Sequence, residues 1–543
     1  MVPTITREEQ PVKQSPKDFK PSPNEWWGVM LLLGLSLVLN TITYRIYPTP
    51  WVDEVSFSEP AINFAQHLGF VTRVWPYQAN NTFPVVNCPL YGLALAGWLK
   101  LAGTSLLAVR WLNYFFAALA GFLTWQLAWR GGLIRRPPNR LALIFMVEFG
   151  YGMVTAMRSS RPDMLGLVLS LALALALCGK SGSRQNWVLL GLSGALVWTG
   201  FQAALFVAFA CVISAWLSRA VTKSQVAIIG CGMVLGVLCL FCLLSYQGVL
   251  SEFLVSIGSV TDQASSAGQL NGIFKIVQNL VLRSTHNLVD DLALLTLFAG
   301  LITLLLLRFL GKYDRTQGQS KRFFLLAVLF VVGTPLLFNA LGHFTIFYSY
   351  MIFLPAGFLF FAVLEAATVQ PPMFHRASQL IMLFTISLVF MLGLPLRLAL
   401  PELFLACQAS QPIFDLLSEN LMTKDVVFCD YQVFFEVKNR VSAVFVPDHL
   451  AAYQSTRYPK RELSYAEKAS ISLLIVNPDD LNDLIRWLGG IWTPVGKPLE
   501  WTVRPAVIRQ TTWFDNKLKH YFSQSPNGKR SLQIYRRTDK VVD

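Results

Sequence analysis

The sequence predicts a polytopic α-helical membrane protein with about eleven transmembrane helices and a small C-terminal α/β extramembrane domain. Of the 543 residues, 54% are hydrophobic and 14% are charged, and the mean hydropathy is +0.48. Soluble domains carry about a quarter charged residues, so much of this chain is expected to lie in lipid. The net charge is +14, and its Lys and Arg residues cluster in short loops between apolar runs. That is the positive-inside pattern, and it requires no nucleic acid as a partner.

Composition divides the chain into three parts. Residues 1–25 are polar and contain Lys13, Lys17 and Lys20, which predicts a disordered cytoplasmic tail without a signal peptide. Residues 26–396 hold the apolar runs and form the predicted transmembrane domain. Residues 397–543 are polar and charged, and we expect them to form a domain outside the membrane.

The apolar runs alternate with cationic loops that all fall on one side of the predicted topology, which is its internal consistency check. A membrane-spanning helix needs about 20 apolar residues. The predicted spans cover residues 26–46, 106–129, 141–157, 164–178, 187–198, 203–217, 226–246, 288–307, 323–341, 346–363 and 378–394.

Two of the predicted external loops are long. The first, 47–104, contains the acidic pair Asp53-Glu54 and an apolar stretch, Pro89 to Leu101, which is too short to span and ends near Lys100. We expect that stretch to be a helix lying in the membrane interface. The second loop, 247–286, is polar.

The C-terminal part shows short β-type runs separated by helical pattern, which predicts a small α/β domain. The predicted strands cover 425–429, 443–446, 471–476 and 531–535, with a helix over 480–488. An odd number of spans places this domain outside, where we expect it to cap the external face and help to hold the acceptor. The sequence has no GxxxxGK[ST] phosphate loop.

The ionisable residues gather at the external ends of the predicted spans, where such groups usually face a cavity or one another. The set consists of Asp53, Glu54, Glu59, Arg73, Arg110, Arg158, Arg161, Asp163, Lys275, His286 and His343. Simpler interpretations stay open for several of them. The acidic pair is also compatible with solvated loop residues, Arg110 with a side chain that reaches the headgroups, and Arg158 to Asp163 with a structural ion pair.

The cysteines indicate no disulfide framework or metal site. Cys178, Cys211, Cys231, Cys239 and Cys242 lie in apolar runs, where thiols pack as small hydrophobic groups. A divalent cation bound by Asp53, Glu54 and Asp163 is possible, but arginine-rich sites handle phosphate without metal, so we expect no required cofactor.

Several motifs together resemble the GT-C superfamily of membrane glycosyltransferases, most of all the branch of the protein O-mannosyltransferases and the bacterial aminoarabinose transferases of lipid A. The acidic pair follows the first span, and Arg110 opens the next. The other motifs are P-L-Y at 89–91, W-L-K-L-x-G at 98–103, R-x-x-R-P-D at 158–163 and H-F-x-x-x-Y at 343–348. The resemblance covers nearly the whole chain in architecture and mostly residues 50–165 in motifs.

The resemblance implies a polyprenyl-phosphate sugar as donor, used on the outer membrane face without a nucleotide. Asp53 matches the first-loop acid, the expected general base, and Glu54 follows it as in the family's D-E form. The remaining predicted roles are donor-phosphate binding by Arg158, Arg161, Asp163 and Lys275, and possible substrate binding by Glu59, Tyr91, Arg110, His343 and Tyr348. The family often reads H-P-P-L-Y where this chain has Asn87-Cys88-Pro89-Leu90-Tyr91, so any role of that histidine is absent.

This chemistry is physically consistent. A sugar hydroxyl is a poor nucleophile, so a carboxylate must accept its proton, and guanidinium groups stabilise the leaving phosphate. Displacement by one acid inverts the anomeric centre. The acceptor, whether lipid, protein or glycan, is left open, as is the sugar. We expect a bacterial inner membrane with the site on the periplasmic side. The alternatives are a transporter or lipid flippase, and third a polysaccharide polymerase or ligase.

Overall fold

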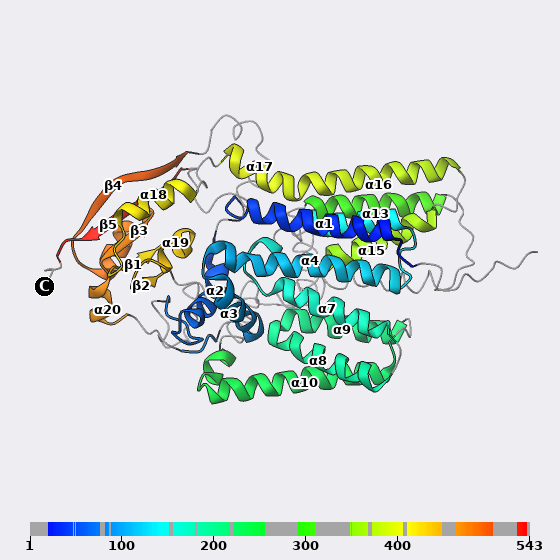
Figure 1. The fold of residues 1–543 in the computed structure, drawn as a ribbon, viewed down its shortest axis with the longest axis horizontal. Coiled ribbons are helices and arrows are strands. Elements are labelled where there is room, and N and C mark those ends of the chain that lie inside the picture. Colours follow the sequence, from blue (N-terminus) through cyan, green and yellow to red (C-terminus); the bar gives the residue numbers. More distant parts are fainter. Residues whose placement is uncertain are drawn as a thin grey trace, which may run out of the picture.

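A computed structural model defines the fold of this chain (Figure 1). It describes residues 20–46, 48, 50–75, 82–85, 88–150, 156–179, 182–217, 221–255, 292–310, 348, 350–367, 372–404, 410–447, 463–502 and 529–539. The predicted span at 323–341, and the loop 247–286 beyond residue 255, lie outside these residues.

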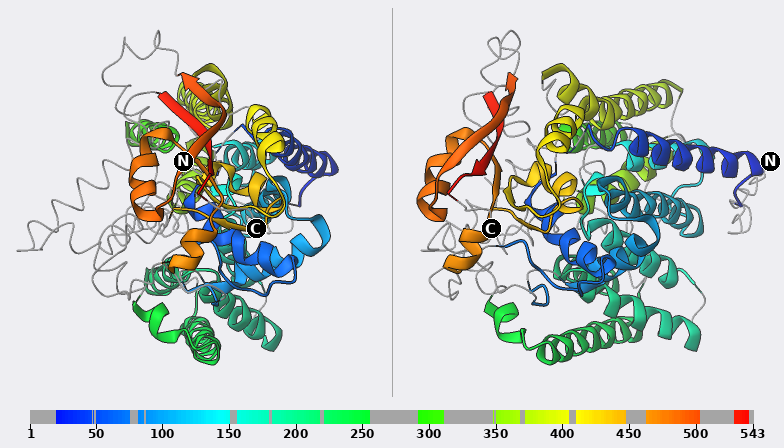
Figure 2. Two further views of the ribbon diagram at one scale, coloured as in Figure 1. Left: turned by 90° about the vertical axis from the view of Figure 1, so that its left-hand side faces the viewer. Right: turned by 60° about the vertical axis from the view of Figure 1, so that its left-hand side comes forward.

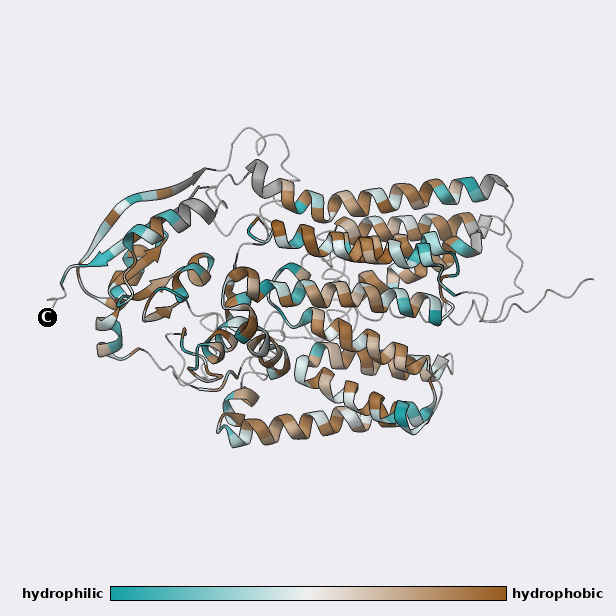
Figure 3. Cartoon of the chain, in the orientation of Figure 1, coloured by the Kyte–Doolittle hydropathy of each residue, from teal (hydrophilic) through white to brown (hydrophobic). Residues whose placement is uncertain are grey.

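Long apolar helices form a bundle. They are α1 Pro23–Ile42, α4 Leu106–Arg130, α5 Pro137–Phe149, α7 Asp163–Leu177, α8 Ser183–Thr199, α9 Phe201–Leu217, α10 Lys223–Tyr246, α13 Leu292–Leu310, α15 Tyr350–Ala367 and α16 Pro372–Leu392. Their apolar surface dominates Figure 3, and large side chains such as Leu31, Trp216 and Val234 are exposed on it. Such faces are stable only in lipid.

Length and hydropathy identify four helices in the described part that can cross a membrane: Pro23–Ile42, Leu106–Arg130, Lys223–Tyr246 and His375–Ala399. Shorter apolar helices lie beside them at Asp163–Leu177, Phe201–Trp216, Leu292–Leu307 and Tyr350–Glu365. The chain is therefore a polytopic helical membrane protein, as predicted. The total of about eleven spans stays a prediction.

Glycines bring two bundle helices into close contact. A Cβ atom added to Gly236 of α10 would lie 2.8 Å from the carbonyl oxygen of Gly194 in α8. Small residues commonly let transmembrane helices approach in this way. By contrast, a Cβ atom added to Gly230, on the same helix, would meet nothing within 4 Å.

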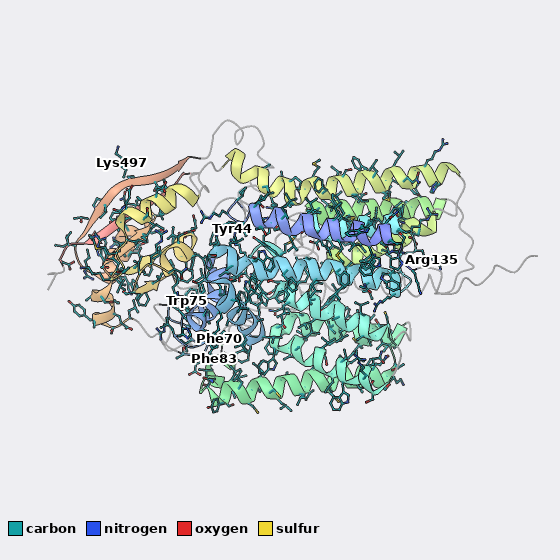
Figure 4. The ribbon with its side chains drawn as sticks, in the orientation of Figure 1. Tyr44, Phe70, Trp75, Phe83, Arg135 and Lys497 are labelled. Carbon is teal, nitrogen blue, oxygen red and sulfur yellow. The ribbon has the colours of Figure 1, made fainter. Side chains whose placement is uncertain are left out.

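Two short helices lie at one end of the bundle, α2 Val52–Ala65 and α3 Pro89–Ala102. Helix α3 confirms the helix predicted from Pro89 to Leu101. Helix α2 was not predicted: the acidic pair stands in its first turn, where carboxylates favour a helix because of its dipole. Arg135 lies at the opposite end of the bundle (Figure 4), in agreement with the predicted separation of the acidic and cationic loops.

The C-terminal residues form one five-stranded sheet of order β2-β1-β3-β5-β4. Strand β1 pairs in parallel with β2 and β3, whereas β5 is antiparallel to β3 and β4. The strands are β1 Val426–Cys429, β2 Ala443–Phe445, β3 Leu473–Val476, β4 Trp492–Thr502 and β5 Lys529–Arg537. The helices in this part of the chain are α18 Ser410–Asn420, α19 Phe434–Lys438, α20 Tyr465–Ser470 and α21 Leu481–Leu488, while α17 Leu394–Phe404 follows α16 at the end of the bundle.

The sheet lies beyond the end of the bundle that carries α2 and α3 (Figures 1 and 2). One hydrophobic core joins the two parts: Val55 and Ile62 of α2 belong to the same buried cluster as Val427, Phe434 and Ile475. The backbone N–H of Val446 also donates to the carbonyl of Val74, at 3.1 Å. The predicted α/β segment thus packs on the predicted first external loop.

The predicted boundary of the N-terminal tail is corrected. Helix α1 begins at Pro23, with Ser22 as its N-cap, and the buried carboxylate of Glu25 binds Arg140 at 2.6 Å. Residues 23–25 therefore belong to the bundle, because the ion pair fixes the start of α1 against α5. Residues 1–19 lie outside the described part of the chain.

Candidate functional site

The acidic pair at the start of α2 is divided between two layers of polar side chains. In the inner layer, Arg110 of α4 donates to both carboxylate oxygens of Glu54, at 2.7 Å each, and both side chains are fully buried. The guanidinium also donates to the carbonyls of Tyr44 and Pro48. A two-pronged ion pair of this kind fixes the angle at which α2 begins.

The inner layer extends to the segment before α7. The backbone N–H of Ser160 donates to Glu54, at 3.1 Å, and the Ser160 hydroxyl lies 2.8 Å from the hydroxyl of Tyr91 on α3. Asn113 of α4 donates to the carbonyls of Ser159 and Arg161. Three helices, α2, α3 and α4, thus hold the 158–163 segment in place.

The outer layer is formed by Asp53, Arg161 and Asp163. The Arg161 guanidinium donates through Nε to Asp163, at 2.7 Å, and through Nη1 to Asp53. The side chains of Arg161 and Asp163 are 5% and 3% exposed, whereas that of Asp53 is 21% exposed. Asp53 is therefore the member of this layer that solvent, and a substrate, reaches most easily.

Electrostatics in the outer layer favour a permanent cation between two carboxylates. Burial alone would lower the pKa of Arg161, but the negative charges of Asp163 and Asp53 outweigh it and raise the pKa. Aromatic rings add to this setting: the guanidinium lies 5.2 Å from the ring centre of Trp51 and 5.8 Å from that of Phe57.

Two tyrosines border the outer layer from the start of α15. The hydroxyl of Tyr350 donates to Asp163, at 3.5 Å, and half-buried Tyr348 interacts electrostatically with Arg161. Tyr348 is one of the residues predicted to bind substrate, and the structure brings it to Arg161. Tyr350 is not among the predicted site residues.

Arg158 is buried more deeply in the protein than a residue that binds the donor phosphate is expected to be. It is fully buried, and Nη1 donates to Asn40, at 2.7 Å, and to Thr43, at 3.0 Å. A polar chain continues inwards, since Asn40 donates to Ser36, whose hydroxyl donates to Glu148 of α5, at 2.6 Å. Asn40, Ser36 and Glu148 were not predicted, because single polar residues in apolar helices give no sequence pattern.

The other predicted residues are distributed as follows. The fully buried Glu54, Tyr91 and Arg110 bond to other protein groups, so the geometry favours support of the site over direct substrate contact. Glu59 of α2 is also fully buried, and burial raises its pKa. Lys275 and His343 lie outside the described residues.

The described residues contain no group of three or more His, Cys, Asp or Glu side chains that could hold a metal ion. The carboxylates considered for a cation bind arginine instead: Asp53 and Asp163 share Arg161, and Glu54 binds Arg110. A positive charge already occupies the space between the two outer carboxylates, and a cation there would be repelled. Metal-independent chemistry stays a prediction.

Comparison of structures finds proteins similar to this chain, whereas comparison of sequences finds none. No protein-family model and no curated protein matches. The fold is similar to that of ArnT from Cupriavidus metallidurans bound to undecaprenyl phosphate, with a TM-score of 0.52 and 13% identity, covering 88% of this chain and 97% of that one. It is also similar to the apo oligosaccharyltransferase of Archaeoglobus fulgidus, with a TM-score of 0.51 and 9% identity, covering 86% and 72%. The chain therefore shares its fold with these two proteins, in agreement with the resemblance to the GT-C superfamily that its motifs indicate.

Proposed function

We propose that this protein is a glycosyltransferase that moves a sugar from a polyprenyl-phosphate donor to an acceptor on the outer face of the membrane. The observation that carries the proposal is the outer layer, in which a partly exposed carboxylate shares a buried guanidinium with a second carboxylate. The similarity to ArnT bound to undecaprenyl phosphate supports a lipid phosphate as the donor. A bacterial inner membrane with a periplasmic site fits this chemistry.

The donor phosphate binds at Arg161 and takes the place of Asp53 on the guanidinium, while Asp163 keeps its own bond. Phosphate and carboxylate compete for the same donors, because each presents two anionic oxygens that a guanidinium fork can bind. Asp53 is thereby released beside the sugar. Tyr348 and Tyr350 border the phosphate, and Arg158 supports the 158–163 segment from behind.

Transfer then proceeds as a single displacement. The acceptor hydroxyl oxygen attacks the anomeric carbon while Asp53 accepts its proton, and the bond from that carbon to the phosphate oxygen breaks. The lipid phosphate leaves with the electron pair of that bond, and Arg161 stabilises the negative charge that grows on it. Attack opposite the leaving group inverts the anomeric centre. The assay below identifies the sugar.

The experiment is mass spectrometry of purified full-length protein incubated with a panel of polyprenyl-phosphate sugars, comparing wild type with Asp53→Asn. Loss of sugar from one donor with wild type alone identifies the donor and supports Asp53 as the base. Asp483→Asn is the matched control, since Asp483 is exposed on α21 and forms a surface ion pair with Arg486. Full transfer by Asp53→Asn would exclude Asp53 as the base.

A transporter or lipid flippase is the second candidate, and Glu148 is the observation that favours it. This carboxylate is buried inside the helix bundle, where ionisable groups commonly line transport paths. A transporter would move the lipid-linked sugar across the membrane of a vesicle without cleaving it. Intact donor on the opposite side of that membrane would therefore distinguish transport from glycosyl transfer. A large loop with its own pattern of arginine and histidine would favour the third candidate, a polysaccharide polymerase or ligase. The only basic residues of the loop 247–286 are Lys275, Arg283 and His286, and residues 256–286 lie outside the described part of the chain.

A further inference from the structure

A short helix of the C-terminal sheet, α19, makes contacts with several separate elements of the bundle end. The carboxylate of Glu436 accepts a hydrogen bond from Arg45, which follows α1, at 3.4 Å. The apolar side of the helix is buried, because Phe434, Phe435 and Val437 belong to the core that also contains Val55 of α2. The apolar side of α19 thus belongs to the core shared with α2, while its polar side chains reach the bundle end.

Asn439 lies directly after α19, and both the oxygen and the nitrogen of its side-chain amide form hydrogen bonds with the bundle end. Its Oδ1 accepts from Gln66 at the end of α2, at 3.0 Å, and from the hydroxyl of Thr104 between α3 and α4, at 2.8 Å. Its Nδ2 donates to the carbonyl of Thr104, at 3.1 Å. One side chain therefore links α2 with the α3–α4 connection.

Lys438, the last residue of α19, lies near enough to the fully buried Glu59, in the middle of α2, for their charges to interact. Burial lowers the pKa of Lys438, and the charge of Glu59 opposes that shift. Glu59 also accepts from Asn63, one turn further along α2, and from the backbone of Arg73. Contacts with the sheet are therefore distributed along α2 from its middle to its end.

We propose that residues 434–439, the α19 clasp, set the position of α2 and thereby place Asp53 against Arg161. The ion pair of Glu54 with Arg110 holds the first turn of α2, and the clasp holds the rest. The link to catalysis rests on the proposed function. Lys438 and Asn439 act here as positioning residues, since neither contacts the outer layer of the site. The C-terminal sheet thus takes part in catalysis by fixing a helix of the bundle end.

The test compares the full-length double variant Lys438→Met/Asn439→Ala with wild type. Hydrogen–deuterium exchange should become about tenfold faster in α2, because each lost hydrogen bond lowers the free energy of local opening, and should stay unchanged in α7. Affinity for undecaprenyl phosphate should not fall, because a displaced Asp53 competes less for Arg161, while kcat for the donor found in the panel falls about 10- to 100-fold, as misplacement of a catalytic group by about 1 Å does.

Three further variants make the test specific. Asn482→Ala removes the same side chain from an exposed position on α21 and should leave both readouts unchanged. Lys438→Arg keeps the charge and should keep kcat near wild type. Asn439→Ala alone removes hydrogen bonds at the surface, so this variant should fold even if the double variant does not. Its hydrogen–deuterium exchange in α2 should be faster than that of wild type, by less than in the double variant.

Unchanged exchange of α2 in Asn439→Ala and in the double variant would overturn the clasp while leaving the transferase proposal intact. Absence of transfer by wild type would instead overturn the proposed function, and the exchange of α2 would still decide whether the clasp exists. A fall in undecaprenyl phosphate affinity equal to the fall in kcat would also overturn the proposal, because it would indicate general damage to the site.

Discussion

The shared guanidinium of Arg161 leads to a prediction that separates catalysis from donor binding. Asp53→Asn should slow transfer strongly and at the same time tighten the binding of undecaprenyl phosphate. In wild type the cluster of Asp53, Arg161 and Asp163 carries one positive and two negative charges, so an incoming phosphate meets a net negative site. With Asn at position 53 the cluster is neutral. Nη1 of Arg161 then faces an uncharged amide, which competes with phosphate less strongly than a carboxylate does.

The size of the effect follows from Coulomb's law. A phosphate bound at Arg161 would lie about 5 Å from the carboxylate of Asp53, and at an effective dielectric constant of about 20 their repulsion is about 3 kcal/mol. Because Asp53 is 21% exposed, solvent screens part of this, which leaves about 1.5–3 kcal/mol. The dissociation constant should therefore fall about 10- to 100-fold, while transfer falls about 10²- to 10⁴-fold through loss of the general base.

The assay is titration of undecaprenyl phosphate into purified protein at low and at physiological salt, with Asp483→Asn as control. The gain in affinity should shrink as salt rises, since screening acts on the exposed carboxylate. Affinity of Asp53→Asn equal to or weaker than that of wild type would show that phosphate and Asp53 do not compete for Arg161, and the proposed release of the base would be wrong.

Three further predictions concern the residues around the site and the bundle. Glu54→Gln should destabilise the protein by about 3–5 kcal/mol, because it leaves a buried arginine without its counter-charge; an unchanged Tm in detergent would contradict the supporting role of this layer. Arg161→Lys should weaken undecaprenyl phosphate binding about tenfold, because lysine keeps the charge but loses the fork, and titration checks this. Gly236→Ala should cost about 1–3 kcal/mol by forcing α10 away from Gly194, whereas Gly230→Ala on the same helix should leave Tm nearly unchanged.

The regular elements could be predicted from the sequence because each has a local signal. The span predicted at 106–129 is α4, Leu106–Arg130, since its apolar run ends at a charged residue. Strands β1 and β3 lie inside their predicted runs because these are short, apolar and β-branched. Strand β4 was missed: Pro494 and Pro498 interrupt its pattern, and the register shifts between Val495 and Leu499.

The pairing of side chains could not be predicted in the same way. Glu54 and Arg110 are 56 residues apart, and Asp53 and Arg161 are 108 apart. No period or spacing links residues so distant in the chain, so the sequence indicates that these charges gather on one side but not which carboxylate binds which arginine. Only the packing of α2 against α4 and the 158–163 segment decides that.

The geometry of α2 explains why two adjacent acids take different positions. Successive residues of an α-helix point about 100° apart, so Asp53 and Glu54 cannot face the same partner. Glu54 faces the interior and is fully buried with Arg110, while the partly exposed Asp53 faces Arg161. A motif of two neighbouring carboxylates thereby supplies an anchor and a reactive group at once. Any change that rotates α2 must disturb both, which is why the ion pair at its start and the α19 clasp along its length are needed together.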